Sequence, residues 1–425
     1  MLSRIKILLC LLLSLPAGVT AQSLPSDDTE RDVRENPVIT ADFSEQLTSI
    51  PAFIKLDRNH IDYNGADWSR IRQRFAERDT VPVSIVHVGD SHLQADYSTG
   101  LTRRLFQGAY GNRGRGLISP LRLAGTNEPR DYSIKSSGRW RSSKLMKPSS
   151  LVPVGFTGVG ISPLSAETDL TVSTLSRTGE GDPFDLVVLY YSGNLAVERV
   201  SIDGKDVAEL DEAEDEPGQI LVMLPEPTSE VTLGIKAGSD AAVYGVSLIN
   251  SVSGGIEYNV IGNNGATYSS YNNLENFSTG VSSLVPDLVV VSLGANEAFG
   301  KTTAEGMYEA IDVLVSNIKR SCPDADILLT TPMECQRRKL TRKGRRSRVY
   351  TVNDKIATMR EAILRYGREK GIATYDWYSV AGGAGASSQW VNDGLMAKDR
   401  IHHSYLGYLL NGQLFFDALN RAIQQ

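Results

Sequence analysis

An apolar run at residues 81–88 is followed at once by the turn Gly89-Asp90-Ser91-His92. Such a run indicates a buried strand, and a Gly-Asp turn at its end would place Ser91 where a helix begins. Open α/β sheets hold their ligands at the carboxyl edge, and a helix start offers free backbone N–H groups to a developing negative charge. The run therefore predicts a parallel α/β sheet with a serine at its functional edge.

Strand-like and helix-like stretches alternate along much of the remaining chain. We expect strands at residues 258–262, 288–293, 326–331 and 373–377, and helices at 97–110, 271–284, 303–320, 353–370 and 405–423. This alternation is typical of a parallel sheet covered by helices on both faces. The predicted fold class is α/β, with the core divided into residues 46–125 and 256–425.

The pattern changes between residues 126 and 255, where short β-like runs replace the alternation. These runs lie at residues 170–175, 186–191, 199–202, 220–224, 231–235 and 242–249. Turn residues such as Asp203-Gly204 and Gly238-Ser239 separate them. We therefore predict an inserted β-sandwich at residues 126–255.

The first 21 residues have the pattern of a cleaved secretory signal. Arg4 and Lys6 precede an apolar core at residues 7–15 that is too short to span a membrane. Cys10 lacks the small residues that a lipoprotein signal needs before it, so we expect no lipid anchor. Residues 22–45 are polar and charged and predict a disordered lead. These features predict a protein of the periplasm or cell envelope.

The charge balance and the cysteines limit the class of protein further. The chain carries 44 Lys and Arg against 50 Asp and Glu, a formal net charge of −6, and loss of the signal removes two more basic residues. This balance argues against a general nucleic-acid binder. Cys322 and Cys335 lie beyond the signal, and the strand expected between them predicts that they do not pair.

The chemistry of Ser91 requires two further groups. A serine hydroxyl is a poor nucleophile near neutral pH, so it needs a base, and the base needs an orienting group. Asp399 and His402, in the segment Asp399-Arg400-Ile401-His402, are three residues apart. We expect them to face each other across one helical turn, so that one short segment delivers both groups.

Two further turns, together with the segments 89–92 and 399–402, make a series of four short sequence blocks. Gly265 lies in Gly262-Asn263-Asn264-Gly265-Ala266-Thr267, and Asn296 lies in Gly294-Ala295-Asn296-Glu297, after the predicted strand 288–293. In order, the four blocks resemble the SGNH (GDSL-type) esterase superfamily, in which Ser, Gly, Asn and His each head one block. The resemblance covers about residues 81–125 and 256–425, and it implies a three-layer, flavodoxin-like core.

The family's functional residues carry over to this sequence position by position. The resemblance implies that Ser91 is the nucleophile and that Asp399 and His402 form the base pair. It also implies that the Ser91 N–H, Gly265 and Asn296 form the oxyanion hole. No metal or organic cofactor is implied.

Local variants point to one branch of the superfamily. His92 stands where Leu is commonest, and Glu297 stands where Asp is more usual. With Gln94, Ala95 and Asp96, these variants resemble the branch of peptidoglycan O-acetylesterases, which carry a carbohydrate-binding-like β domain beside the core. The resemblance implies an exported serine esterase that removes O-acetyl groups from a carbohydrate such as peptidoglycan.

Several alternatives stay open at this point. An acetyl-xylan or sialate-type esterase, a lipase and a non-catalytic glycan-binding envelope protein are the competing functions. Asp90-Ser91-His92 also matches the Asp-x-His opening of a binuclear metallophosphoesterase, but the chain has only five histidines and lacks the later ligand motifs.

The basic run 337–348 is either a solvated loop or a clamp for an anionic polymer. Trp377 and Trp390 either pack in the core or stack on sugars.

Overall fold

The computed structural model describes residues 50–174, 181–207, 218–251, 254–340 and 348–425. The predicted signal and the predicted disordered lead lie outside these residues. No helix in the described part is long and apolar enough to cross a membrane.

The core is a mostly parallel sheet with the strand order β1-β19-β16-β15-β2-β14, and only the β1–β19 pair is antiparallel. The strands span Ile61–Asp62 (β1), Ala373–Tyr375 (β19), Asp326–Thr330 (β16), Leu288–Ser292 (β15), Val83–Gly89 (β2) and Ile256–Gly262 (β14). In the register of the sheet, Gly89 is opposite both Gly262 and Ser292. The loops that follow β2, β14 and β15 therefore start side by side at one carboxyl edge.

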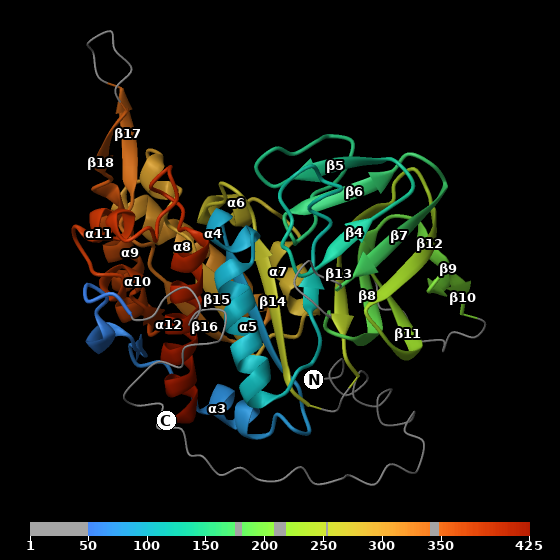
Figure 1. Ribbon diagram of the computed structural model, residues 1–425, viewed down its shortest axis with the longest axis horizontal. Coiled ribbons are helices and arrows are strands. Elements are labelled where there is room, and N and C mark those ends of the chain that lie inside the picture. Colours follow the sequence, from blue (N-terminus) through green and yellow to red (C-terminus); the bar gives the residue numbers. More distant parts are fainter. Residues whose placement is uncertain (1–49, 175–180, 208–217, 252–253, 341–347) are drawn as a thin grey trace.

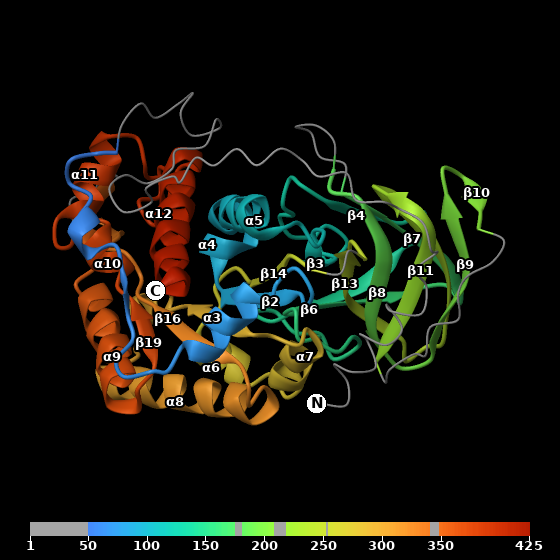
Figure 2. The same ribbon diagram turned by 90° about the horizontal axis from the view of Figure 1, so that it is seen from below.

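Helices cover both faces of this sheet (Figure 2). One face carries α5 (Tyr97–Tyr110) and α12 (Tyr405–Gln424). The other carries α6 (Tyr268–Asn272), α7 (Phe277–Ser283), α8 (Ala304–Ser321) and α9 (Lys355–Lys370). The shorter elements are η1 (Leu56–Arg58), α3 (Ser69–Ala76), α4 (Ser91–Gln94), η2 (Glu297–Phe299), α10 (Trp377–Val380) and α11 (Ala386–Asn392). The predicted three-layer α/β fold is confirmed.

The structure departs from one prediction about the core and adds detail to the basic run. The single helix expected at residues 271–284 is two helices, because α6 begins after a capping box on Thr267 and ends at Asn272, before α7 starts at Phe277. The ends of the basic run 337–348 lie in an antiparallel strand pair, β17 (Gln336–Leu340) and β18 (Arg348–Val352). Residues 341–347 of that run lie outside the described residues.

Beside the core stands a sandwich of two antiparallel sheets (Figure 1). Their strand orders are β10-β9-β12-β7-β4 and β11-β8-β13-β6-β5, and β3 pairs with β13. The strands span Gly116–Ile118 (β3), Ser133–Lys135 (β4), Trp140–Lys144 (β5), Val159–Pro163 (β6), Glu167–Ser173 (β7), Phe184–Ser192 (β8), Leu195–Ile202 (β9), Lys205–Asp206 (β10), Gln219–Thr228 (β11), Glu230–Ala237 (β12) and Ala242–Ile249 (β13). Five of the six predicted β-like runs fall within strands, and the run at 170–175 overlaps β7 as far as Ser173, whereas β3 precedes residue 126.

A buried ion-pair cluster joins the sandwich to the core. Asp96 accepts hydrogen bonds from Arg103 (2.9 Å) and Arg115 (2.6 Å), and both guanidinium groups also pair with Asp131. Asp96 precedes α5, whereas Asp131 lies on the segment that leads into β4. Burial raises the pKa of Asp131, but the two guanidinium groups outweigh it and hold that pKa below its usual value. The cluster therefore ties the start of the sandwich to the segment just after Ser91.

Candidate active site

The turn after β2 fixes the position of Ser91. A side chain on Gly89 would begin 2.5 Å from Leu93 and 2.8 Å from the Ser292 carbonyl oxygen, so only glycine fits. Asp90 caps α4, because its Oδ1 accepts a hydrogen bond from the His92 N–H (2.9 Å). Ser91 is then the first residue of α4. The structure thus has the predicted sequence of strand, turn and helix.

Ser91, His402 and Asp399 form one hydrogen-bonded chain. Ser91 Oγ lies 2.8 Å from His402 Nε2, and His402 Nδ1 lies 2.7 Å from Asp399 Oδ2. The His402 side chain is 34% exposed and the Asp399 side chain 47% exposed, so solvent reaches the pair. The three predicted residues come together in the order that a nucleophile, a base and an orienting carboxylate require.

The segment that carries Asp399 and His402 is a turn rather than the predicted helical turn. Asp399 Oδ1 accepts hydrogen bonds from the N–H groups of Ile401 (2.9 Å) and His402 (3.0 Å). Arg400 has a φ of +59°, which is the left-handed region and does not continue a helix. The local bonds of the carboxylate therefore replace helical bonds, because Asp side chains readily cap their own backbone in this way.

The β17–β18 strand pair supports this 399–402 turn. The Gln336 N–H donates to the Arg400 carbonyl oxygen (2.9 Å), and Arg400 Nη1 donates to Gln336 Oε1 (2.9 Å). The Arg400 guanidinium lies 4.3 Å from the ring centre of Tyr350, whose hydroxyl donates to the Lys398 carbonyl oxygen. These contacts were not predicted, because no sequence pattern relates the basic run to a turn about 50 residues later.

The carboxylate of the pair is stabilised in its charged form. Burial raises the pKa of Asp399, but the hydrogen bonds from the His402 ring and from the Ile401 and His402 N–H groups outweigh it. The net effect holds the pKa of Asp399 below its usual value of 3.8. Asp399 is therefore negative at neutral pH and can orient the imidazole and stabilise its protonated form.

Gly265 and Asn296 lie in the loops after β14 and β15, at the same edge as Ser91. Gly265 has a φ of +80°, and among the described residues the N–H groups of Ser91 and Gly265 donate no hydrogen bond. Asn296 Nδ2 donates to the Ala266 carbonyl oxygen (2.9 Å) and to Asp90 Oδ2 (3.2 Å). Two backbone donors are thus free, whereas the Asn296 amide must exchange one contact before it can bind an oxyanion.

Asp90 has a role that the sequence did not reveal. Its two carboxylate oxygens accept from the His92 N–H and from Asn296, so it links the first and third blocks. It is only 2% exposed, and burial raises the pKa of Asp90 to about 6. Its contact with Asn296 Nδ2 (3.2 Å) is longer than its contact with the His92 N–H (2.9 Å).

The two family variants, His92 and Glu297, are part of the supporting structure. Glu297 Oε1 accepts a hydrogen bond from the Tyr268 N–H (2.7 Å), and burial raises the pKa of Glu297 to about 7. His92 Nδ1 lies 3.2 Å from the Tyr408 hydroxyl, and burial lowers the pKa of His92 to about 3. The neutral His92 ring packs against the His402 ring at 5.2 Å between centres.

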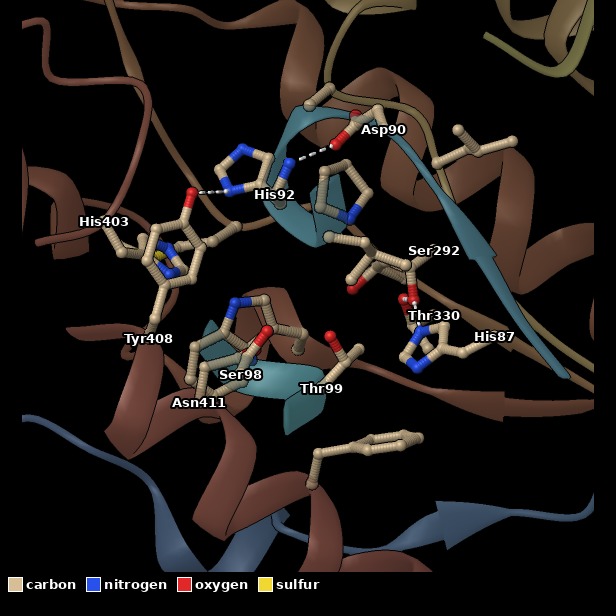
Figure 3. A pocket seen from close by; sticks show the side chains of 18 of the residues that line it. His87, Asp90, His92, Ser98, Thr99, Ser292, Thr330, His403, Tyr408 and Asn411 are labelled. Atoms are coloured by element: carbon tan, nitrogen blue, oxygen red, sulfur yellow. Dashed lines mark hydrogen bonds between the residues drawn. The ribbon is translucent and has the colours of Figure 1, made fainter. Parts of the chain in front are cut away.

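The neighbouring His403 packs among aromatic rings, whereas the contact of Ser91 Oγ is with His402. The His403 ring is buried between Trp390 and Tyr408, each 4.9 Å away between ring centres. With His92 and Tyr408 it lines one side of an internal cavity, opposite His87 (Figure 3). Burial holds the pKa of His403 well below its usual value, so this ring is neutral. The prediction that His402 rather than His403 is the base agrees with this geometry.

The remaining candidates have structural positions. Trp377 is 6% exposed and Trp390 is fully buried, so the suggestion that they stack on sugars was wrong and both pack in the core. Cys322 and Cys335 are buried and free. Among the described residues, no group of three or more His, Cys, Asp and Glu side chains could hold a metal ion.

Comparison with known proteins shows which family the second half of the chain resembles. Residues 237–410 match the model of the GDSL-like Lipase/Acylhydrolase family, which takes in the blocks of Gly265, Asn296 and His402 but not Ser91. Curated proteins give no match. Residues 237–410 of the chain are thus similar to the GDSL-like family, as the order of the Gly265, Asn296 and His402 blocks predicts.

Solved structures show how far the likeness in fold extends. A peptidoglycan O-acetylesterase structure matches with a TM-score of 0.67 and 20% identity, covering 86% of this chain and 99% of that chain. A lipase/acylhydrolase from Enterococcus faecalis matches with a TM-score of 0.30 and 20% identity, covering 40% and 77%. An acetyl xylan esterase matches with a TM-score of 0.31 and 16% identity, covering 39% and 81%. The first match spans the core together with the sandwich.

Proposed function

We propose that the protein is an exported serine esterase that removes O-acetyl groups from a carbohydrate, with peptidoglycan as the leading substrate. The observation that carries this proposal is the chain of contacts from Ser91 Oγ to His402 Nε2 (2.8 Å) and from His402 Nδ1 to Asp399 (2.7 Å). It lies at the carboxyl edge of the sheet, beside two free backbone donors. Acyl transfer to serine needs these groups in this arrangement.

The reaction proceeds in two halves. Ser91 Oγ attacks the acetyl carbonyl carbon while His402 takes the hydroxyl proton, and the same proton then passes to the departing sugar oxygen. The acetyl group is left on Ser91. Water next attacks this ester with His402 again as base, and acetate and free Ser91 are released. In both halves the oxyanion binds the Ser91 and Gly265 N–H groups and the Asn296 amide.

The substrate class rests on three supports. The matched peptidoglycan O-acetylesterase structure covers both the core and the sandwich, so the likeness extends beyond the hydrolase fold. A sandwich tethered beside the Ser91 edge is suited to bind the remote part of a polymer. The signal-like residues 1–21 favour a location in the periplasm or cell envelope, where peptidoglycan lies.

Acetate release tests the proposal directly. Purified protein is given O-acetylated peptidoglycan and acetylated xylan side by side, with Ser91→Ala as the matched control. We expect faster release from peptidoglycan and no enzymatic release by Ser91→Ala. Faster acetate release from acetylated xylan would indicate an acetyl-xylan esterase instead. No release from any acetyl ester would favour a non-catalytic glycan-binding protein.

A further inference from the structure

A second cavity lies between the core and the sandwich, next to Gly265. Gln94 and Asn264 line it from the core, and Lys144, Met146 and Lys147 line it from the end of β5 and the loop that follows. In Figure 1, β5 and β6 lie at the end of the sandwich that is nearest to α4 and α6. The cavity therefore adjoins the place where the sugar of a bound acetyl ester would lie.

The polar wall of this cavity is fixed relative to Ser91. Gln94 is the last residue of α4, the helix that Ser91 begins. Its Nε2 donates to Asn127 Oδ1 (2.7 Å), and its Oε1 accepts from the Asn264 N–H (2.7 Å). Asn264 Nδ2 also donates to Asn127 Oδ1 (2.8 Å). One carboxamide network thus joins the nucleophile helix, the Gly265 loop and the sandwich.

Met146 supplies an apolar surface beside the proposed oxyanion donor. Its Cγ lies 3.6 Å from the point where a side chain on Gly265 would begin. Its sulfur accepts a hydrogen bond from Ser270 Oγ (3.2 Å), which holds the thioether against α6. The residue is still 51% exposed. Exposed apolar atoms held in place in this way suit the apolar face of a sugar ring.

The two lysines differ in what their charges already contact. Lys144 Nζ donates to the carbonyl oxygens of Ala124 (2.8 Å) and Gly125 (3.3 Å). Lys147 is exposed, and within the described residues its side chain makes no hydrogen bond or ion pair. Its backbone is held by reciprocal bonds with Lys144 (2.8 and 3.3 Å). Among the described residues, none that lines the cavity is acidic, so Lys147 presents a positive charge available to an anionic ligand.

We propose that this cavity is a subsite for a carboxylate-bearing sugar of the glycan. Lys147 pairs with the carboxylate, the Asn264 carboxamide bonds a hydroxyl or acetamido group, and Met146 covers the ring. This inference rests on the proposed esterase function and deepens it, because it selects an acidic acetylated glycan over a neutral one. Muramic acid, which carries a lactyl carboxylate, belongs to the selected class.

A matched pair of substrates isolates the carboxylate. The first is an O-acetylated muramic acid glycan fragment, and the second is the same fragment with its carboxylates converted to amides. The readout is the ratio of kcat/KM for the acid to kcat/KM for the amide. The variants are Lys147→Met, Lys147→Glu and the control Lys205→Glu, which makes the same charge change at the exposed β10 edge of the sandwich.

We expect the wild-type ratio to favour the acid by roughly 1.5-fold to fivefold, the size that a solvent-exposed ion pair contributes. Lys147→Met brings the ratio to about one, Lys147→Glu inverts it, and Lys205→Glu leaves it at the wild-type value. A ratio that Lys147→Met leaves unchanged overturns the subsite. Absence of acetate release from both fragments by the wild-type protein would instead overturn the proposed function on which the subsite rests.

Discussion

Ser91 Oγ and His402 Nε2 lie 2.8 Å apart, although 311 residues separate them in the chain. Ser91 follows β2 and shortly precedes α5, and His402 shortly precedes α12. Helices α5 and α12 pack against each other on one face of the sheet, and the Thr102 hydroxyl donates to the Gly412 carbonyl oxygen (3.0 Å) between them. The approach of the two side chains is therefore a consequence of how the core packs.

The first prediction compares the adjacent histidines. His402→Ala should lower kcat by about 10⁴-fold or more, because it removes the group that accepts the Ser91 proton. His403→Ala should lower kcat less than about tenfold and act mainly on stability, since this ring packs against Trp390 and Tyr408. Steady-state kinetics and thermal unfolding of both variants separate the two effects. If His403→Ala lowered kcat more than His402→Ala does, His403 rather than His402 would be the base.

The second prediction concerns Asn296. Asn296→Ala should reduce kcat by roughly 10²- to 10³-fold with little change in KM, because this donor acts on charge that forms only in the transition state. In the resting structure its amide already donates to Ala266 and Asp90, so ground-state binding gains little from it. Kinetics on a small acetyl ester provide the measurement. A rise in KM at constant kcat would instead make Asn296 a substrate contact.

The third prediction concerns the attachment of the sandwich. Asp131→Ala should lower the free energy of unfolding by about 2 kcal/mol, because it leaves the buried Arg103 and Arg115 with Asp96 alone. Asp206→Ala, in an exposed pair with Arg199 at 3.9 Å, is the matched control and should change stability by less than about 0.5 kcal/mol. Urea unfolding measures both. Equal losses in the free energy of unfolding of the two variants would show that the buried cluster contributes no more to stability than the exposed pair does.

This cluster also determines how a deletion experiment has to be designed. Removing residues 126–255 takes away Asp131 but leaves Arg103 and Arg115 buried in the core. The core remnant would then carry an uncompensated buried charge. A deletion variant therefore needs both arginines replaced before its activity on polymeric and small substrates can be compared.

The fourth prediction uses the buried carboxyl of Asp417 in α12. Gln413 Nε2 donates to it (3.0 Å), yet burial raises the pKa of Asp417 from 3.8 to about 7. The folded protein thus holds this proton more tightly than the unfolded chain does. The resulting stability is complete below about pH 4 and is lost as the pH rises towards 7.

Asp417→Asn imitates the protonated form at every pH. The variant should therefore be more stable than the wild type at pH 8, by roughly 1–3 kcal/mol, with a smaller gain at pH 5. Denaturant unfolding at the two pH values measures the difference. An equal gain at both values would mean that Asp417 does not titrate in this range.

Much of the core was predictable because its signals are local. Residues 97–110 and 405–423 have helical periodicity, and the runs at 81–88 and 288–293 are apolar enough to be central strands; all four became the expected elements. The short strands β3 and β4 were missed because three residues carry no periodicity of their own. Each is stabilised by pairing with a distant strand, β13 or β7.

The residues of the candidate site stand out in the sequence, but the contacts that support them do not. Ser91, Gly265, Asn296, Asp399 and His402 each lie in a recognisable block. The local bonds that make 399–402 a turn, and the contacts of Gln336 and Tyr350 with Arg400, depend on side chains that meet only in the folded chain. The same holds for the Asp90–Asn296 contact, which no spacing indicates.

The central claim is that Ser91 carries the acetyl group during turnover. The most direct measurement is peptide mass spectrometry after an acid quench of the enzyme mixed with an excess of acetylated substrate. The proposed mechanism predicts one acetyl group on the peptide that contains Ser91, accumulating when deacylation is slower than acylation, and none on that peptide in Ser91→Ala. Wild-type rates of acetate release by Ser91→Ala, or an acetyl group that turns over on another residue, would contradict it.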